Sequence, residues 1–372
     1  MTETKTKERM DFLDIAKGIG GVWMIHCHVV HALLKPGIKV PWYYPDLLHG
    51  LPASCFLLCA GFVFIILFEN AKKKNEIELR MKRLLYRCGQ IILLGYGLQL
   101  PYFSLRKLLY TPISHTQLLR FFQANILQCI GLSLILLALF IWALKRFNTI
   151  FAGYCAGAIG LLIIFASYWI GEHTSFPIYL QSYFAFKQKS LFPIFPFGGI
   201  LFFGAAAGSF YMYMKSRNKI QMAFIIFIIF GILFVYTSFS PLYAAFASWG
   251  RANPIHYINK IGQGLLALGV SYYLQKVTGL VKHLVDLHAL IGIETPFVYA
   301  FHLVILYGYP FNFGLYQYFA ASLSYAMVTL VAIILILFTL LFTWFWAEFK
   351  KRTPRGVRIF LLIIFLIFVF KP

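Results

Sequence analysis

Acidic residues are the scarcest chemical class in this chain, and charged residues of any kind are few. Only 12% of the 372 residues are charged, with 12 Asp and Glu against 33 Lys and Arg. A soluble domain carries about 25% charged residues, so this chain has too few to cover a water-exposed surface of its size. Its residues are instead 60% hydrophobic and 19% aromatic, as expected of a protein for which the bilayer is part of the solvent.

Two features that mark many secreted proteins are also missing. The six cysteines form no Cys-x-x-Cys pair and lie in or beside apolar segments, which favours small buried side chains over a metal site or disulfides. The basic start of the chain precedes an apolar run that contains Asp14 and Lys17 and lacks a clean cleavage site. We therefore expect a retained first membrane span rather than a cleaved signal peptide.

Long polar stretches are absent too, and this determines how the positive charge is interpreted. A net charge of +21 could indicate binding to nucleic acid. The basic residues, however, occur as short clusters between apolar runs, which is the distribution typical of membrane topology. We therefore expect no nucleic-acid partner.

What the chain does have is a series of apolar segments that are long enough to span a bilayer. A spanning helix needs about 20 apolar residues, and these segments lack the alternation of barrel strands. We predict an all-α polytopic membrane helix bundle with ten or eleven transmembrane helices, forming a single domain over residues 1–372. The predicted spans are 12–34, 51–69, 88–104, 124–144, 150–171, 191–214, 220–239, 255–275, 284–308, 319–347 and a short terminal span, 357–370, that is partial or tilted.

The distribution of Lys and Arg predicts the orientation of the bundle. With a cytoplasmic N-terminus, 22 of these residues fall in the inner segments and eight in the outer ones. The largest inner clusters lie at 72–87 and 350–358. Because the excess holds at nearly every turn of the chain, we predict that the N-terminus is cytoplasmic.

The first predicted span carries the largest number of polar residues. Its polar and small residues recur at steps of three and four, which places them on one helical face. This face consists of Asp14, Lys17, Gly21, Met24, His28 and His31. Asp14 and Lys17 can form an ion pair near the cytoplasmic end. His28 lies about 16 Å further along the axis, where an imidazole can take a proton from an incoming nucleophile.

Two other interpretations of these histidines stay open. His28 and His31 could join one helix to another by hydrogen bonds, as polar residues in membrane bundles do. They could also be two ligands of a metal ion, with His49 or His302 as the third. Because no carboxylate accompanies them at a ligand spacing, we expect no metal.

Small residues indicate where helices pack closely. Gly18, Gly20 and Gly21 leave room on the first span for a neighbouring helix or a narrow ligand. Gly204 and Gly208 have the spacing of close helix contacts. Further polar residues open or interrupt other spans, at 49–52, 123–128, 193–199 and 292–296. A Pro-broken membrane helix frees backbone groups that must line a cavity or be buried, so these segments could wall one intramembrane site.

Five stretches, in this order, resemble the transmembrane acyltransferase superfamily. It includes acyltransferase family 3 and the bacterial relatives of heparan-alpha-glucosaminide N-acetyltransferase. The stretches are RMDFLDIAKGI (9–19) with His28 eleven residues after Lys17, FLLCAGF (56–62), ILQCIGL (126–132), FPF (195–197) with Gly204 and Gly208, and IGIETPFVYAFH (291–302). The resemblance spans residues 9 to about 308. Lys17 stands where the superfamily usually has Arg, and the scarcity of arginine in the core loops favours the heparan-type branch.

The resemblance implies a membrane-bound acyltransferase in a bacterial inner or plasma membrane. It would move an acyl group, expected to be acetyl, from acyl-CoA onto a hydroxyl or amino group of a cell-envelope glycan. Acetyl-CoA or another acyl-CoA is then a co-substrate. The other partners are a glycan or lipid-linked sugar acceptor, the lipid bilayer and, as one option, a second copy of the chain in a homodimer.

The same resemblance assigns roles to the polar residues. His28 is expected to act as the general base or to hold the acyl group transiently. Asp14, Lys17 and His31 are expected to support it or to bind the donor. The residues expected to contact the acceptor or the thioester are His49, Gln128, Glu294 and His302.

Two functions of other classes remain as alternatives. A multi-pass transporter or flippase for an envelope sugar or lipid would use the polar face of the first span as its path. A non-catalytic scaffold or sensor would use the histidines as a pH-sensitive element.

Overall fold

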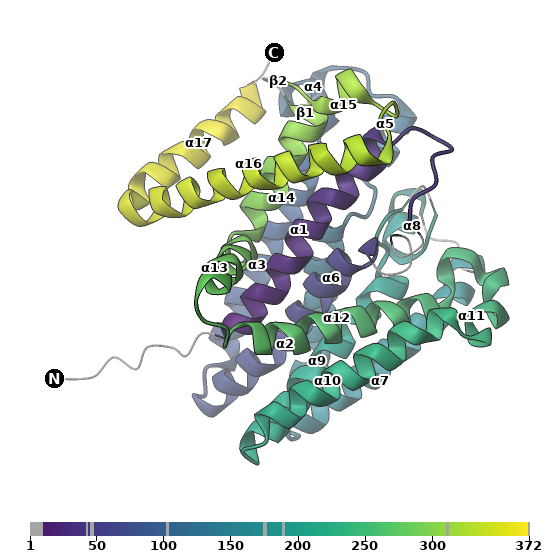
Figure 1. Cartoon of the computed structure of the whole chain (residues 1–372), viewed down its shortest axis with the longest axis vertical. Coiled ribbons are helices and arrows are strands. Elements are labelled where there is room, and N and C mark those ends of the chain that lie inside the picture. Colours follow the sequence, from purple (N-terminus) through teal and green to yellow (C-terminus); the bar gives the residue numbers. More distant parts are fainter. Residues whose placement is uncertain are drawn as a thin grey trace.

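The computed structural model describes residues 10–41, 44, 48–101, 104–173, 177–187, 190–309 and 312–370, and within these ranges the chain is a helical bundle (Figure 1). The all-α prediction is confirmed. The basic segment at residues 1–9, the end of the third predicted span at 102–103 and Lys371 lie outside the described residues.

Ten helices of 17 to 28 residues form most of the described chain. They are α1 (Asp11–Leu33), α2 (Leu51–Lys73), α3 (Ile77–Leu98), α6 (Ile126–Ala143), α7 (Thr149–His173), α9 (Ile194–Ser216), α10 (Ile220–Tyr236), α12 (Pro254–Leu274), α16 (Tyr325–Arg352) and α17 (Pro354–Phe370). Two further helices, α13 (Leu280–Ile293) and α14 (Thr295–Tyr307), form a pair bent by 86°.

Short elements connect the long helices. The helical ones are α4 (Leu105–Tyr110), α5 (His115–Phe121), α8 (Ile178–Phe184), the 3-10 turns η3 (Thr237–Phe239) and η4 (Ala247–Ala252), α11 (Pro241–Ala245) and α15 (Leu315–Phe319). The two-residue strands β1 (Gly308–Tyr309) and β2 (Asn312–Phe313) pair antiparallel.

The predicted spans coincide with helices, and the bundle is that of an integral multi-pass membrane protein. Within the described residues, six helices are long and apolar enough to cross a bilayer, or seven spans if the bent pair counts as one. The six are α2, α6, α7, α9, α10 extended through η3, and α16. Helices α1, α3 and α12 are as long but less apolar.

Three predicted spans have different limits in the structure. The range 319–347 is shifted, because α16 runs from Tyr325 to Arg352. The range 88–104 was placed too late, because α3 begins at Ile77, immediately after a turn in which Asn75 has a positive φ of 56°. The basic residues between Arg80 and Arg87 lower the hydropathy of this helix without preventing its formation. The range 284–308 is two helices, since the chain bends at Glu294, within the predicted interruption at 292–296.

Helix α1 lies in the middle of the bundle. It packs against α2, α12, α13, α14 and α16, and Figure 1 shows α16 crossing in front of it. Ionisable groups in a span are costly unless they face protein or water, so a helix with this many polar residues must be enclosed by others. We name the end of the bundle where α1 begins the inner end and the opposite end the outer end.

Glycines allow the helices to approach one another at backbone distance. A methyl group at Gly61 on α2 would overlap the carbonyl oxygen of Leu201 on α9, and one at Gly204 would overlap that of Leu58. The small-residue contact predicted for Gly204 is therefore present, and it joins α9 to α2. The six cysteines are free, and five of them are buried, as their apolar surroundings predicted.

The α2–α9 contact generates a stability prediction. Gly61→Ala and Gly204→Ala should each destabilise the protein by about 1–3 kcal/mol, because the added methyl groups force two backbones apart. The control is Gly89→Ala on α3, where a methyl group would meet no atom within 4 Å and alanine is the better helix former. Thermal unfolding in detergent measures all three. Equal melting temperatures for the wild type and the two α2–α9 variants would contradict this packing.

Candidate active site

Two histidines from distant parts of the chain meet in the outer half of the bundle. His28 on α1 and His302 on α14 lie with Nδ1 of His28 2.7 Å from Nε2 of His302. Their rings are nearly parallel, with an interplanar angle of 11° and centroids 5.1 Å apart. His302 is fully buried, whereas His28 keeps partial exposure. The structure therefore brings together two residues that the sequence analysis placed in one site.

The hydrogen bonds of this pair determine which nitrogen of His28 is free. Nδ1 of His302 lies 2.6 Å from the carbonyl oxygen of Val298, and because a carbonyl only accepts, this nitrogen must carry the proton. In a neutral ring Nε2 of His302 is then an acceptor, so Nδ1 of His28 donates to it. Nε2 of His28 is left with its lone pair and makes no hydrogen bond to a described residue. A neutral imidazole held in this way can accept a proton from a nucleophile.

Tyr299 forms one wall of this site. Its ring stands nearly perpendicular to both imidazoles, with centroids 6.4 Å from His28 and 5.9 Å from His302. Its hydroxyl lies 3.4 Å from Oδ1 of Asn125. Asn125 is also the N-cap of α6, accepting from the backbone N–H of Ile126 at 2.8 Å. The cap thereby ties the start of α6 to α14 beside the histidine pair.

The other predicted outer residues lie at the surface or in a neighbouring interface. His31 and His49 are exposed at the outer end of α1 and just before α2. Gln128 is buried one turn below Asn125, and its amide donates to Oε1 of Gln99 on α3. Its own Oε1 accepts no hydrogen bond from any residue that the structure describes. Gln128 thus joins α6 to α3 and has no described bond to His28.

Lys260 on α12 is a candidate site residue that the sequence analysis missed. It is buried in the outer half of the bundle with 5% of its surface exposed. It interacts electrostatically with His49 and His256, and His49 also interacts with His28. A pattern in the sequence could have identified Lys260. His256, Lys260 and Gln263 follow one another at steps of four and three within an apolar span. The polar face of α1 has the same spacing.

At the inner end, Asp14 and Lys17 form the predicted ion pair. The Lys17 Nζ lies 2.7 Å from Oδ1 of Asp14, which confirms that these residues offset each other's charge. A methyl group at Gly18 would overlap the carbonyl oxygen of His288 on α13, and one at Gly292 that of Asp14. Of the two interpretations of the α1 glycines, a close neighbouring helix is therefore the one observed.

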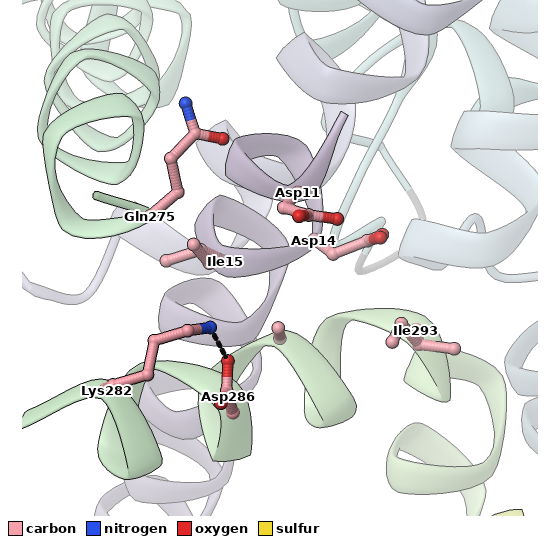
Figure 2. A pocket seen from close by; sticks show the side chains of 8 residues that line it. Asp11, Asp14, Ile15, Gln275, Lys282, Asp286 and Ile293 are labelled. Atoms are coloured by element: carbon pink, nitrogen blue, oxygen red, sulfur yellow. Dashed lines mark hydrogen bonds and ion pairs between the residues drawn. The ribbon is translucent and has the colours of Figure 1, made fainter. Parts of the chain in front are cut away.

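A small cavity opens beside this ion pair. It has a volume of about 160 Å³ and lies between α1, the end of α12 and α13. Figure 2 shows Asp11 and Asp14 on one side and the ion pair of Lys282 with Asp286 on the other. Three carboxylates line the cavity. Because they repel other negative charges, the cavity is unsuited to bind the phosphates of a nucleotide-like donor.

Glu294 lies away from the histidine pair. It sits at the bend between α13 and α14, where its carboxylate accepts from Lys350 of α16 at 2.6 Å. His302 follows eight residues later, about 12 Å along the helix at about 1.5 Å per residue. The bend turns Glu294 toward the inner end, so the structure gives it a different environment from that of His28.

The metal interpretation of the histidines finds no supporting geometry in the described ranges. Among those residues, no group of three or more His, Cys, Asp or Glu side chains could hold a metal ion. His28 and His302 instead form a hydrogen bond with each other.

Comparison with known proteins places this arrangement in a family. None of the curated proteins matches the chain. Residues 9–226 match the family model described as heparan-alpha-glucosaminide N-acetyltransferase, catalytic, a range that contains the polar face of α1 and more than half of the chain. The chain therefore belongs to the heparan-alpha-glucosaminide N-acetyltransferase catalytic family and is a membrane protein of an acetyltransferase family.

Proposed function

We propose that this protein transfers an acetyl group from acetyl-CoA to a hydroxyl or amino group of a cell-envelope glycan or lipid-linked sugar, with His28 as the general base. The observation that carries the proposal is the orientation of His28, whose Nε2 is left as a proton acceptor by the hydrogen bonds to His302 and Val298. Family membership supplies the reaction class. The proposed location is a bacterial inner membrane, with the N-terminus in the cytoplasm.

The chemistry follows from the free nitrogen. Nε2 of His28 takes the proton of the acceptor hydroxyl or amine as the acceptor oxygen or nitrogen bonds to the thioester carbon. The tetrahedral intermediate then collapses and the carbon–sulfur bond breaks. The thiolate of CoA leaves and takes the proton from the imidazolium, so that His28 returns to its starting state.

The two ends of α1 suit the two substrates. The acetyl donor is proposed to enter from the inner end, where Lys17 is held by Asp14 and Glu294 is held by Lys350. The basic clusters at 72–87 and 350–358 at that end would attract its phosphates. The acceptor is proposed to bind at the outer end, near His31 and His49. Gln128 would support the site by holding α6 against α3. All the residues given roles here belong to one chain, so the proposal does not require a homodimer.

The first prediction concerns the base itself. His28→Ala should lower acetyl transfer by about 10²–10⁴-fold, the usual contribution of a general base, while binding of acetyl-CoA is retained. The measurement is transfer of radiolabelled acetyl from acetyl-CoA by purified protein in detergent. The control is His26→Leu, because His26 is buried on the same helix and its Nδ1 has no hydrogen bond in the described structure. A folded His28→Ala protein that acetylates at the normal rate would contradict the role of His28 as general base.

The same assay separates the enzyme from the transporter. Well-folded wild-type protein that neither binds acetyl-CoA nor turns it over would contradict the acetyltransferase proposal. Gradient-coupled flux of a sugar or lipid through reconstituted vesicles would then identify a transporter.

The second prediction concerns His302 as a positioning residue. His302→Ala removes the acceptor that fixes the Nδ1 proton of His28, and we expect kcat to fall by about 10–100-fold, the usual cost of losing a group that orients an imidazole, with little change in KM. His302→Gln keeps an acceptor and should retain more activity than His302→Ala. The pH dependence of kcat is the readout that a purely structural role would leave unchanged. Identical pH profiles for wild type and both variants would refute it.

A further inference from the structure

The outer half of the bundle contains a buried lysine that no described carboxylate balances. Lys260 is 5% exposed in the interior of α12, and it forms no hydrogen bond or ion pair with the described part of the chain. Every carboxylate whose side chain is described lies toward the inner end. A buried charge without a partner is strongly unfavourable in a membrane bundle, so this ammonium group points to an anion that binds beside it.

The ammonium of Lys260 lies against the N-terminus of α2. Gly50 is the N-cap of that helix and has no side chain to cap it, and a methyl group at Gly50 would overlap Lys260 Nζ. The N-terminus of a helix presents free N–H groups and the positive end of the helix dipole. Two positive groups at one point repel each other, whereas together they attract an anion.

Side chains around this point connect it to the proposed active site. His256 lies one turn before Lys260 on the same face of α12, and His49 immediately precedes Gly50. Both interact electrostatically with Lys260, and His49 also does so with His28. The anion that Lys260 attracts would thus lie in the outer half of the bundle, the half that also contains His28.

We propose that Lys260 and the N-terminus of α2 bind an oxyanion of the acceptor, either the carboxylate of an acidic sugar or the phosphate of a sugar phosphate or lipid-linked sugar. The assignment of this anion to the acceptor rests on the proposed acetyltransferase function, whereas anion binding at Lys260 does not. In this arrangement the anion fixes the sugar while His28 deprotonates the group to be acetylated.

The test measures anion binding without requiring turnover. Full-length protein in detergent is melted in increasing glucuronate, glucose 6-phosphate or glucose, at an ionic strength held constant with chloride. A ligand that binds only the folded state raises Tm in a saturable manner. We expect glucuronate, glucose 6-phosphate or both to raise the Tm of the wild type, and glucose to have no effect. The responding probe identifies the carboxylate or the phosphate as the group recognised.

Variants assign the effect to Lys260. Lys260→Met should have a higher Tm than the wild type without ligand, because an unpaired buried charge is removed, and its affinity for the anion should fall more than tenfold. Lys260→Gln, which keeps a polar head, is the second variant. The control is Lys276→Gln at the inner end beyond α12, where the ammonium lies 4.2 Å from the centroid of the Tyr272 ring; it should respond like the wild type.

Three results would overturn the proposal. Equal anion responses in wild type and Lys260→Met would show that the effect lies elsewhere. Loss of Tm or of folding in both Lys260 variants would show that the lysine is structurally paired. Asp46 precedes α2 in the sequence and lies outside the described residues. A similar loss in Asp46→Asn would identify its carboxylate as the partner of Lys260 in place of a ligand.

An activity measurement separates this proposal from the proposed function. If phosphate is the group recognised, Lys260→Met should lower kcat/KM for acetylation of glucosamine 6-phosphate. This decrease should be more than tenfold larger than the decrease in kcat/KM for acetylation of glucosamine. No transfer by the wild type to any acceptor, together with a Lys260-dependent Tm shift, would refute the acetyltransferase function and leave the anion site standing. Transfer that is indifferent to Lys260 would refute the assignment of this anion to the acceptor and leave the acetyltransferase function standing.

Discussion

The cost of placing a polar helix in a membrane governs the arrangement of this bundle. Helix α1 carries two aspartates, a lysine and three histidines, and lipid offers none of them a hydrogen bond. Contacts within α1 and with the surrounding helices offset this cost. At the inner end Lys17 pairs with Asp14, and α13 closes on the glycines at backbone distance. At the outer end α14 supplies His302 as the partner of His28.

Much of this could be predicted from the chain, because the information is local. The polar face of α1 repeats at helical spacing, so the Asp14–Lys17 pair and the alignment of His28 could be derived from a single segment. The interruption at 292–296 was visible in its glycine and proline residues, and the helices begin and end close to the predicted limits wherever apolar residues run unbroken. The start of α3 was missed because its basic first turns have low hydropathy although they are helical.

What could not be derived was which residues meet across the bundle. His28 and His302 are separated by 274 positions, and no local pattern in the sequence shows that their side chains meet. Glu294 was grouped with them by the resemblance, but an 86° bend lies beside it and Lys350 of another helix pairs with it. Lys260 lies on a polar face of α12 that the sequence contains, but its burial against Gly50 depends on how α12 packs against α2.

The placement of His302 on α14 has a consequence for the order of events in a catalytic cycle. The bent pair α13–α14 covers the polar face of α1 along its length. His302, the partner of His28, belongs to α14 and is therefore part of this covering pair. Any outward movement of α14 that admits a substrate therefore also separates the two imidazoles, and the proton on His28 is then free to occupy either nitrogen. In the proposed mechanism His28 is set as the base only after α14 has returned, so the proposed enzyme would be least able to activate water while the site is open.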